Sequence, residues 1–149
     1  MAKPPKVQPW MIFASVTLLA LGLNRMLPWP LPDFAYARPL GWGVFALGLV
    51  FLFGGMGYLS KAFKARGVWD PDQLITGGFL KFSRNPFYLG VGLTIAGVGL
   101  QRGLPWLISG ALVMLLLLNF LVIPFEETML EEKFGKAYLA YRKRVRRWL

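Results

Sequence analysis

Residues 40–60 read LGWGVFALGLVFLFGGMGYLS and contain no Asp, Glu, Lys or Arg. As a helix, a run of this length reaches about 30 Å, which is the thickness of the hydrocarbon core of a bilayer. A buried helix of a soluble domain needs only about 10–14 apolar residues. This stretch therefore predicts a membrane-spanning helix.

Three further segments read in the same way, over residues 10–27, 79–100 and 105–125. Only 16% of the 149 residues are charged, against about 25% in soluble proteins. We therefore predict a single integral membrane domain over residues 1–149. Its fold class is all-α, a membrane helical bundle with four transmembrane helices.

The alternative for the first segment is a cleaved signal peptide, with Lys3 and Lys6 before the apolar run and Ala35-Tyr36-Ala37 as the cleavage site. A cleavage site would directly follow the apolar run, but this tripeptide lies well beyond it, with Arg25 between them. We therefore expect the first segment to span the membrane.

The third segment is the least regular of the four. Its clean apolar part, Phe87 to Leu100, is too short to cross a bilayer, so we expect the helix to begin near Phe79. Pro86 then lies near the helix start, where proline is tolerated. In the second segment, Gly41, Gly48 and Gly55 recur at heptad spacing and predict close packing against another helix.

The last residues, from Glu126 to Leu149, are charged but keep a helical apolar pattern. Apolar and aromatic side chains recur every three or four residues, at Leu130, Phe134, Tyr138, Tyr141, Val145 and Trp148. The other face is basic. The pattern predicts a C-terminal amphipathic helix that lies on the membrane surface.

The distribution of basic residues predicts the orientation. The net charge is +10, from 17 basic and 7 acidic residues. Fourteen of the basic residues belong to the N-terminus, the loop over residues 61–84 and the tail, and the other three are Arg25, Arg38 and Arg102. This asymmetry predicts a multi-pass protein of the bacterial inner membrane with both termini cytoplasmic. It also favours membrane lipids over nucleic acid as partners.

Because Cys and His are absent, thiol chemistry and a zinc site are excluded, and we expect no metal.

Two polar clusters flank the hairpin of the third and fourth segments. One is Arg84-Asn85-Pro86-Phe87-Tyr88, where the third segment begins, and the other is Glu126-Glu127, where the fourth ends. An outer turn brings both to the inner face, and ionisable groups at that depth suggest function. The simpler alternative is that Arg84 extends to the interface and the two glutamates open the tail helix.

The order of several motifs resembles the isoprenylcysteine carboxyl methyltransferase and phospholipid methyltransferase families. The motifs are Leu74-Ile75-Thr76-Gly77-Gly78, Arg84-Asn85-Pro86-Phe87-Tyr88-Leu89-Gly90, Glu126-Glu127, and Phe134-Gly135 with Tyr138 and Tyr141-Arg142. The resemblance covers residues 73–148. It implies a helical membrane enzyme that transfers a methyl group from S-adenosylmethionine to a lipid or lipophilic acceptor. The cofactor site is then on the cytoplasmic side, within residues 73–149.

The resemblance also implies roles for particular residues. Glu126 is expected to bind the amino group of the cofactor, a charge-assisted contact. Glu127 and Arg84 are the catalytic candidates, with Glu127 as proton acceptor for an amine nucleophile. The remaining cofactor-binding candidates are Gln73, Leu74, Ile75, Asn85, Pro86, Phe87 and Tyr88.

The sequence departs from the family pattern at three places. Asn85 stands where a histidine is frequent, and Gly78-Phe79-Leu80 replaces Gly-Pro-Tyr. Val122 replaces an arginine of the prenylcysteine enzymes, which puts a free carboxylate as acceptor in doubt. Two alternatives stay open: a membrane reductase of the sterol-reductase type, with Lys81 and Arg84 binding NADPH, and a membrane scaffold without activity.

Overall fold

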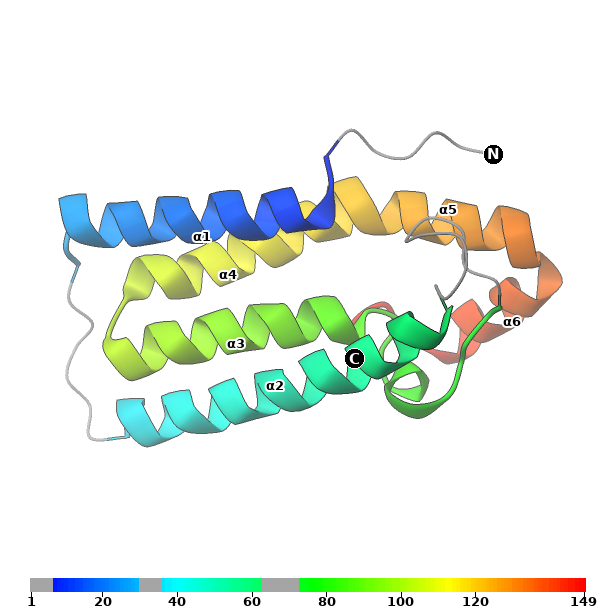
Figure 1. Cartoon of the computed structure of the whole chain (residues 1–149), viewed down its shortest axis with the longest axis horizontal. Helices are drawn as coiled ribbons and strands as arrows, with labels where there is room; N and C mark the ends of the chain where they lie inside the picture. The colour runs from blue at the N-terminus through cyan, green and yellow to red at the C-terminus, as the bar shows by residue number, and fades with distance from the viewer. Residues whose placement is uncertain (1–6, 30–35, 63–72) are drawn as a thin grey trace.

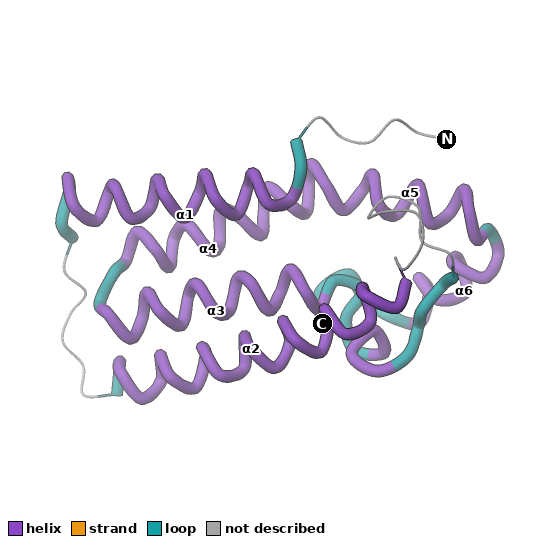
Figure 2. Tube along the Cα trace, viewed as in Figure 1, coloured by secondary structure: helices purple, strands orange, loops and turns teal. Residues whose placement is uncertain are grey.

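The structure is a computed structural model that describes residues 7–29, 36–62 and 73–149. Several residues on which the sequence interpretation rests lie outside these ranges. They are Lys3, Lys6 and Ala35, and the basic residues Lys64 and Arg66 of the loop over residues 61–84. Within the described ranges all regular structure is helical, which confirms the all-α class (Figure 2).

Four long helices form the body of the molecule. They are α1 (Pro9–Met26), α2 (Ala37–Ala62), α3 (Pro86–Arg102) and α4 (Pro105–Leu117). In Figure 1, α1 lies along α4, α4 along α3, and α3 along α2, in agreement with the helix pairs that are in contact. A five-residue π-turn, η2 (Leu118–Val122), joins α4 to α5 (Ile123–Phe134), and α6 (Lys136–Arg144) follows. A short 3₁₀ turn, η1 (Gly78–Lys81), precedes α3.

Glycines set the close approach of α2 and α3. A Cβ atom on Gly48 would collide with the backbone of Thr94, and one on Gly55 would lie 2.7 Å from the backbone nitrogen of Phe87. Gly41 opposes Gln101 in the same way. Because numbers rise along α2 as they fall along α3, the helices are antiparallel over the whole stripe. The packing that the heptad glycines predict is therefore confirmed.

Within the part of the chain that the structure describes, three stretches of helix are long and apolar enough to cross a membrane, namely Pro9–Met26, Ala37–Gly57 and Pro105–Phe134. Helix α3 has 17 residues, so a fourth span remains a prediction. Large apolar side chains are exposed on all three stretches, for example Leu18 (68%), Phe53 (60%) and Phe120 (71%). Such surfaces need an apolar solvent, which a bilayer provides.

Helix boundaries differ from the sequence prediction at two places. The third segment does not start as a helix at Phe79, because the chain makes η1, bends through Phe82–Asn85 and enters α3 only at Pro86. The single tail helix from Glu126 is also wrong. Gly135, with φ of 50°, separates α5 from α6, and a left-handed φ of this kind favours glycine. After Arg144 the chain leaves the helix and returns toward the start of α3.

Candidate active site

One cavity of about 500 Å³ lies at the end of the bundle where α3 begins and α5 passes it. All ten residues that the sequence singled out line it: Gln73, Leu74, Ile75, Arg84, Asn85, Pro86, Phe87, Tyr88, Glu126 and Glu127. Helices α1 and α2 add Pro9, Trp10, Phe13, Gly55 and Met56, and Gln8 lies just before α1. The remaining walls are Leu80, Met129, Leu130, Tyr138 and Tyr141. The volume falls in the usual range for small-molecule sites, about 300–1,000 Å³.

The bend before α3 places the first wall of the cavity. Pro86 begins the helix, where its missing N–H leaves no hydrogen bond unmade. The Ser83 side chain is fully buried, and its hydroxyl oxygen accepts the backbone N–H of Asn85 at 3.1 Å. This local turn fixes Asn85 at the helix entrance, and Phe87 and Tyr88 follow on the first turn of α3.

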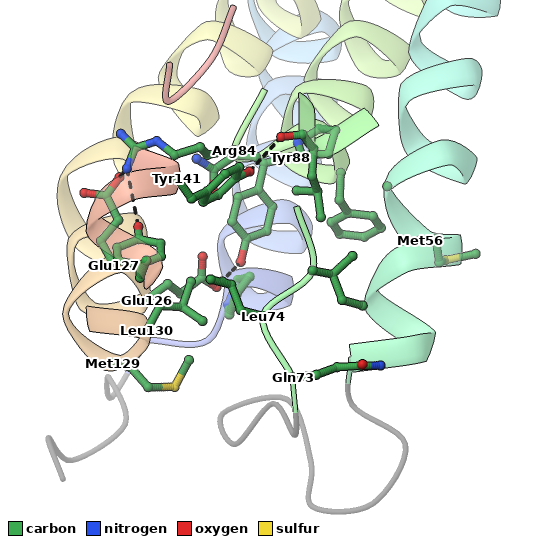
Figure 3. A pocket seen from close by; sticks show the side chains of 18 of the residues that line it. Met56, Gln73, Leu74, Arg84, Tyr88, Glu126, Glu127, Met129, Leu130 and Tyr141 are labelled. Atoms are coloured by element: carbon green, nitrogen blue, oxygen red, sulfur yellow. Dashed lines mark hydrogen bonds and ion pairs between the residues drawn. The ribbon is translucent and has the colours of Figure 1, made fainter. Parts of the chain in front are cut away.

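Glu126 and Tyr88 meet inside the cavity. The Tyr88 hydroxyl donates to Oε1 of Glu126 at 2.5 Å, and Figure 3 shows the two side chains pointing toward each other. Among the described residues, Tyr88 is the partner that the structure gives Glu126. Because this hydrogen bond uses Oε1, the second carboxylate oxygen is the candidate acceptor for a bound ligand.

Glu127 lies beside this pair in a buried cluster of charges. Its Oε1 lies 2.9 Å from Nη1 of Arg84, and its two oxygens receive Nε and Nη2 of Arg147 at 3.0 and 2.7 Å. The Glu127 side chain is only 9% exposed, and a buried carboxylate needs such partners. Within the described chain, Nε of Arg84 is buried without a hydrogen-bond acceptor. The cluster thus leaves one donor unused in the wall of the cavity.

Two tyrosines of α6 close the site from the tail. The Tyr138 hydroxyl accepts from Nη1 of Arg84 at 3.3 Å, and the Tyr141 hydroxyl donates to the carbonyl of Leu80 at 2.8 Å. Burial raises the pKa of both hydroxyls, that of Tyr141 to about 12. Both therefore remain neutral hydrogen-bonding groups at physiological pH. Because Tyr138 and Tyr141 are buried against the protein, this part of the apolar face of the tail does not contact lipid.

Sequence reasoning missed Arg147, Asn119 and Ser83. Asn119 was noticeable as the one strongly polar side chain of an apolar run, but nothing in the sequence paired it with the tail. In the structure, its Oδ1 accepts from Nη1 of Arg147 at 3.1 Å. Arg147 stands in a run of basic residues, which usually indicates a solvated surface. Its bidentate contact with Glu127 depends on the return of the chain after α6.

The arrangement can bind a mainly apolar molecule that presents a cation to Glu126. It gives no support to the reductase alternative, since Lys81 is exposed and does not line the cavity, and Arg84 is paired with Glu127. A phosphate-bearing nicotinamide cofactor needs free cations, which the described walls of this cavity do not offer.

Comparison with known proteins bears on the family of the chain. A protein of Haemophilus influenzae, described as uncharacterized, is 46% identical over 50 residues, which are 34% of this chain and 76% of that protein. No solved structure matches the chain. The sequence model described as phospholipid methyltransferase matches residues 36–137, which include α2, α3, α4 and α5. Because this match covers more than half of the chain, the protein belongs to the phospholipid methyltransferase family, which supports its being a membrane methyltransferase.

Proposed function

We propose that this protein transfers a methyl group from S-adenosylmethionine to a lipid or lipophilic acceptor at the cytoplasmic face of the membrane. The observation that carries the proposal is the cavity. The α3–α4 hairpin separates the two glutamates of α5 from residues 73–75 and the start of α3 in the sequence, yet all of them line one cavity in a member of a methyltransferase family.

The polar groups of the cavity suit the methionine part of this cofactor, which has one ammonium and one carboxylate. Glu126 has an oxygen without a partner among the described residues and is our candidate for the ammonium. The buried, unused Nε of Arg84 is our candidate donor to the carboxylate. The apolar residues Leu74, Ile75 and Phe87 provide walls for the remainder.

The acceptor is inferred from the other walls. Trp10 and Phe13 come from α1, and Met56 comes from α2, and both helices expose apolar side chains along their length. The cavity therefore borders the surfaces that we assign to the hydrocarbon. A lipophilic molecule held in the bilayer could reach it without crossing water.

When bound, S-adenosylmethionine would supply a methyl group on a positively charged sulfur, and its transfer to a nucleophile would break the carbon–sulfur bond and release the sulfur as a neutral thioether. Such a reaction needs alignment and exclusion of water more than acid–base groups. We propose that Tyr88 orients Glu126, and that Arg84 and Glu127 hold the cofactor end of the cavity. Both Glu127 oxygens are engaged by guanidinium groups, so its role as a proton acceptor has less geometric support than this holding role.

The orientation belongs to the same proposal. The fourteen basic residues at one side of the predicted topology favour a cytoplasmic cavity in a bacterial inner membrane. The cavity lies at the bundle end that also carries the basic tail.

Methyl transfer from labelled cofactor tests the proposal. Purified protein in detergent is mixed with S-adenosylmethionine carrying a labelled methyl group and with a lipid extract of its own host membranes. We expect label in the organic phase, and much less with Glu126→Gln. The control Glu131→Gln removes a charge from the exposed side of the same helix and should retain activity. If the wild type transfers no more label than a sample without protein, this proposal is refuted.

A further inference from the structure

The last residues of the chain form a strap across the entrance of α3, which we define as Arg146–Trp148. The backbone N–H of Arg84 donates to the carbonyl of Arg146 at 3.0 Å. The carbonyl of Arg147 accepts from Nδ2 of Asn85 at 3.0 Å and from the Ser83 hydroxyl at 3.3 Å. In Figure 1 the C-terminus accordingly lies back beside the bundle. The strap thus holds two lining residues, Arg84 and Asn85, by main-chain contacts.

The other side of the strap is fixed to the π-turn of the long helix. In η2 the N–H of Ile123 donates to the carbonyl of Leu118, five residues earlier. The next donor in that register would be residue 124, which is proline and has no N–H. The carbonyl of Asn119 is thereby left for another donor, and Nη1 of Arg147 lies 3.5 Å from it.

The side chain of Asn119 strengthens this attachment. Its Oδ1 accepts from Nη1 of Arg147 at 3.1 Å and from the indole N–H of Trp148 at 3.2 Å. The Trp148 ring also packs against the hydrophobic core. A π-turn in a helix often marks a functional position, and here it creates the acceptor that anchors the strap.

The Arg147 side chain connects the strap, which contacts both the start of α3 and η2, to the charged cluster around Glu127. Its guanidinium makes a bidentate contact with Glu127, whose Oε1 in turn holds Arg84. The hydrogen bond to Glu127 raises the pKa of Arg147, so the contact stays charged at every physiological pH. Arg147 does not line the cavity. Its effect on a ligand must therefore pass through residues that do.

We propose that Arg147 is a positioning residue, which holds Arg84 through Glu127 and Asn85 through its own carbonyl, in the geometry that the cavity needs to bind its cofactor. The cofactor part of this inference rests on the proposed function. Residues 146–148 lie beyond the stretch that the family comparison matches. The strap is thus a feature that the comparison does not include.

The first test needs no ligand. Hydrogen–deuterium exchange is measured on a peptide that covers residues 83–87, in the wild type, Arg147→Gln and Arg146→Gln. Arg146 is exposed, so its variant removes an equal charge from the neighbouring position and keeps the main-chain carbonyl. We expect exchange at the Arg84 amide to accelerate about tenfold or more in Arg147→Gln, as the loss of about 1.4 kcal/mol of protection implies, and to stay at the wild-type rate in Arg146→Gln.

The second test measures affinity for S-adenosylhomocysteine by calorimetry in the same three proteins. We expect Arg147→Gln to bind about tenfold more weakly and Arg146→Gln to match the wild type. Arg147→Lys should lie between them, because an ammonium cannot make the two parallel contacts of a guanidinium. The lysine variant also supplies the comparison if the glutamine variant does not fold.

These outcomes separate the strap from the proposed function. A wild type that binds no cofactor refutes the proposed function, and the exchange experiment still decides the strap. If Arg147→Gln is folded and exchanges at the wild-type rate, the positioning role is overturned. It is also overturned if Arg147→Gln exchanges faster but binds S-adenosylhomocysteine with unchanged affinity. Wild-type affinity and exchange in Arg147→Lys would likewise show that the bidentate contact positions nothing.

Discussion

Substituting Gly48 by alanine tests how α2 and α3 are packed, on which the position of the cavity wall depends. A Cβ atom at Gly48 would lie 2.6 Å from Oγ1 of Thr94 and 2.9 Å from the carbonyl carbon of Leu93. At Gly43, on the exposed side of the same helix, a Cβ atom would meet nothing within 4 Å. The two positions differ in packing but share the helix and the substitution.

The expected magnitude follows from those distances. Ordinary van der Waals contact between heavy atoms needs about 3.5–4.0 Å, so the two helices would have to separate by roughly 1 Å. Overpacking of this kind destabilises by about 1–3 kcal/mol. Replacing glycine by alanine within a helix by itself stabilises by up to about 1 kcal/mol. We therefore expect Gly48→Ala to be about 1–3 kcal/mol less stable than Gly43→Ala.

Unfolding in mixed detergent micelles, followed by circular dichroism, measures the free energy of both variants. The leucine pair, Gly48→Leu and Gly43→Leu, should enlarge the difference, because the larger side chain can extend into lipid only at residue 43. Equal stability of the two alanine variants would refute the packing described here.

Two further predictions concern the tail and the topology. Tyr141→Phe removes the hydrogen bond to Leu80 and should lower the free energy of unfolding by about 1 kcal/mol, measured by thermal unfolding. Burial raises the pKa of Tyr141 to about 12, above its usual value of about 10. The stability that the protonated Tyr141 hydroxyl contributes is therefore present below pH 10 and is lost as the pH rises to 12. Between pH 10 and 12 the free energy of unfolding of Tyr141→Phe should fall less steeply than that of the wild type. Parallel falls in the two proteins would contradict this. Reporter fusions at Met1 and Leu149 should both report the cytoplasm, and a result split between the two sides would rule out the predicted orientation.

The helices could be predicted where a short stretch of sequence determines the structure by itself. Residues 40–60 contain no charge, and their glycines recur every seven residues, so both the helix and its closely packed face follow from composition and spacing. The clusters at Arg84–Tyr88 and Glu126–Glu127 were also visible. Their meeting in one cavity follows from the hairpin turn between them.

The tail shows why the remainder was hidden. Apolar spacing continues from Leu130 through Tyr138 as if one helix ran on, and periodicity does not register the single left-handed residue at Gly135 that ends it. Arg147 has the same chemistry as its basic neighbours. Only the return of the chain toward Asn119 distinguishes it, and that contact joins segments whose approach no local pattern encodes.

Calorimetric titration with S-adenosylhomocysteine tests the central claim most directly. We expect the folded wild type to bind, and Glu126→Gln to bind about tenfold to a hundredfold more weakly, since a lost charge-assisted contact is worth about 1.5–3 kcal/mol. Tyr88→Phe should cause a smaller loss, and Glu131→Gln none. Binding that is insensitive to Glu126→Gln would remove that residue from the site. A folded wild type that binds neither this product nor S-adenosylmethionine at millimolar concentration would contradict the account.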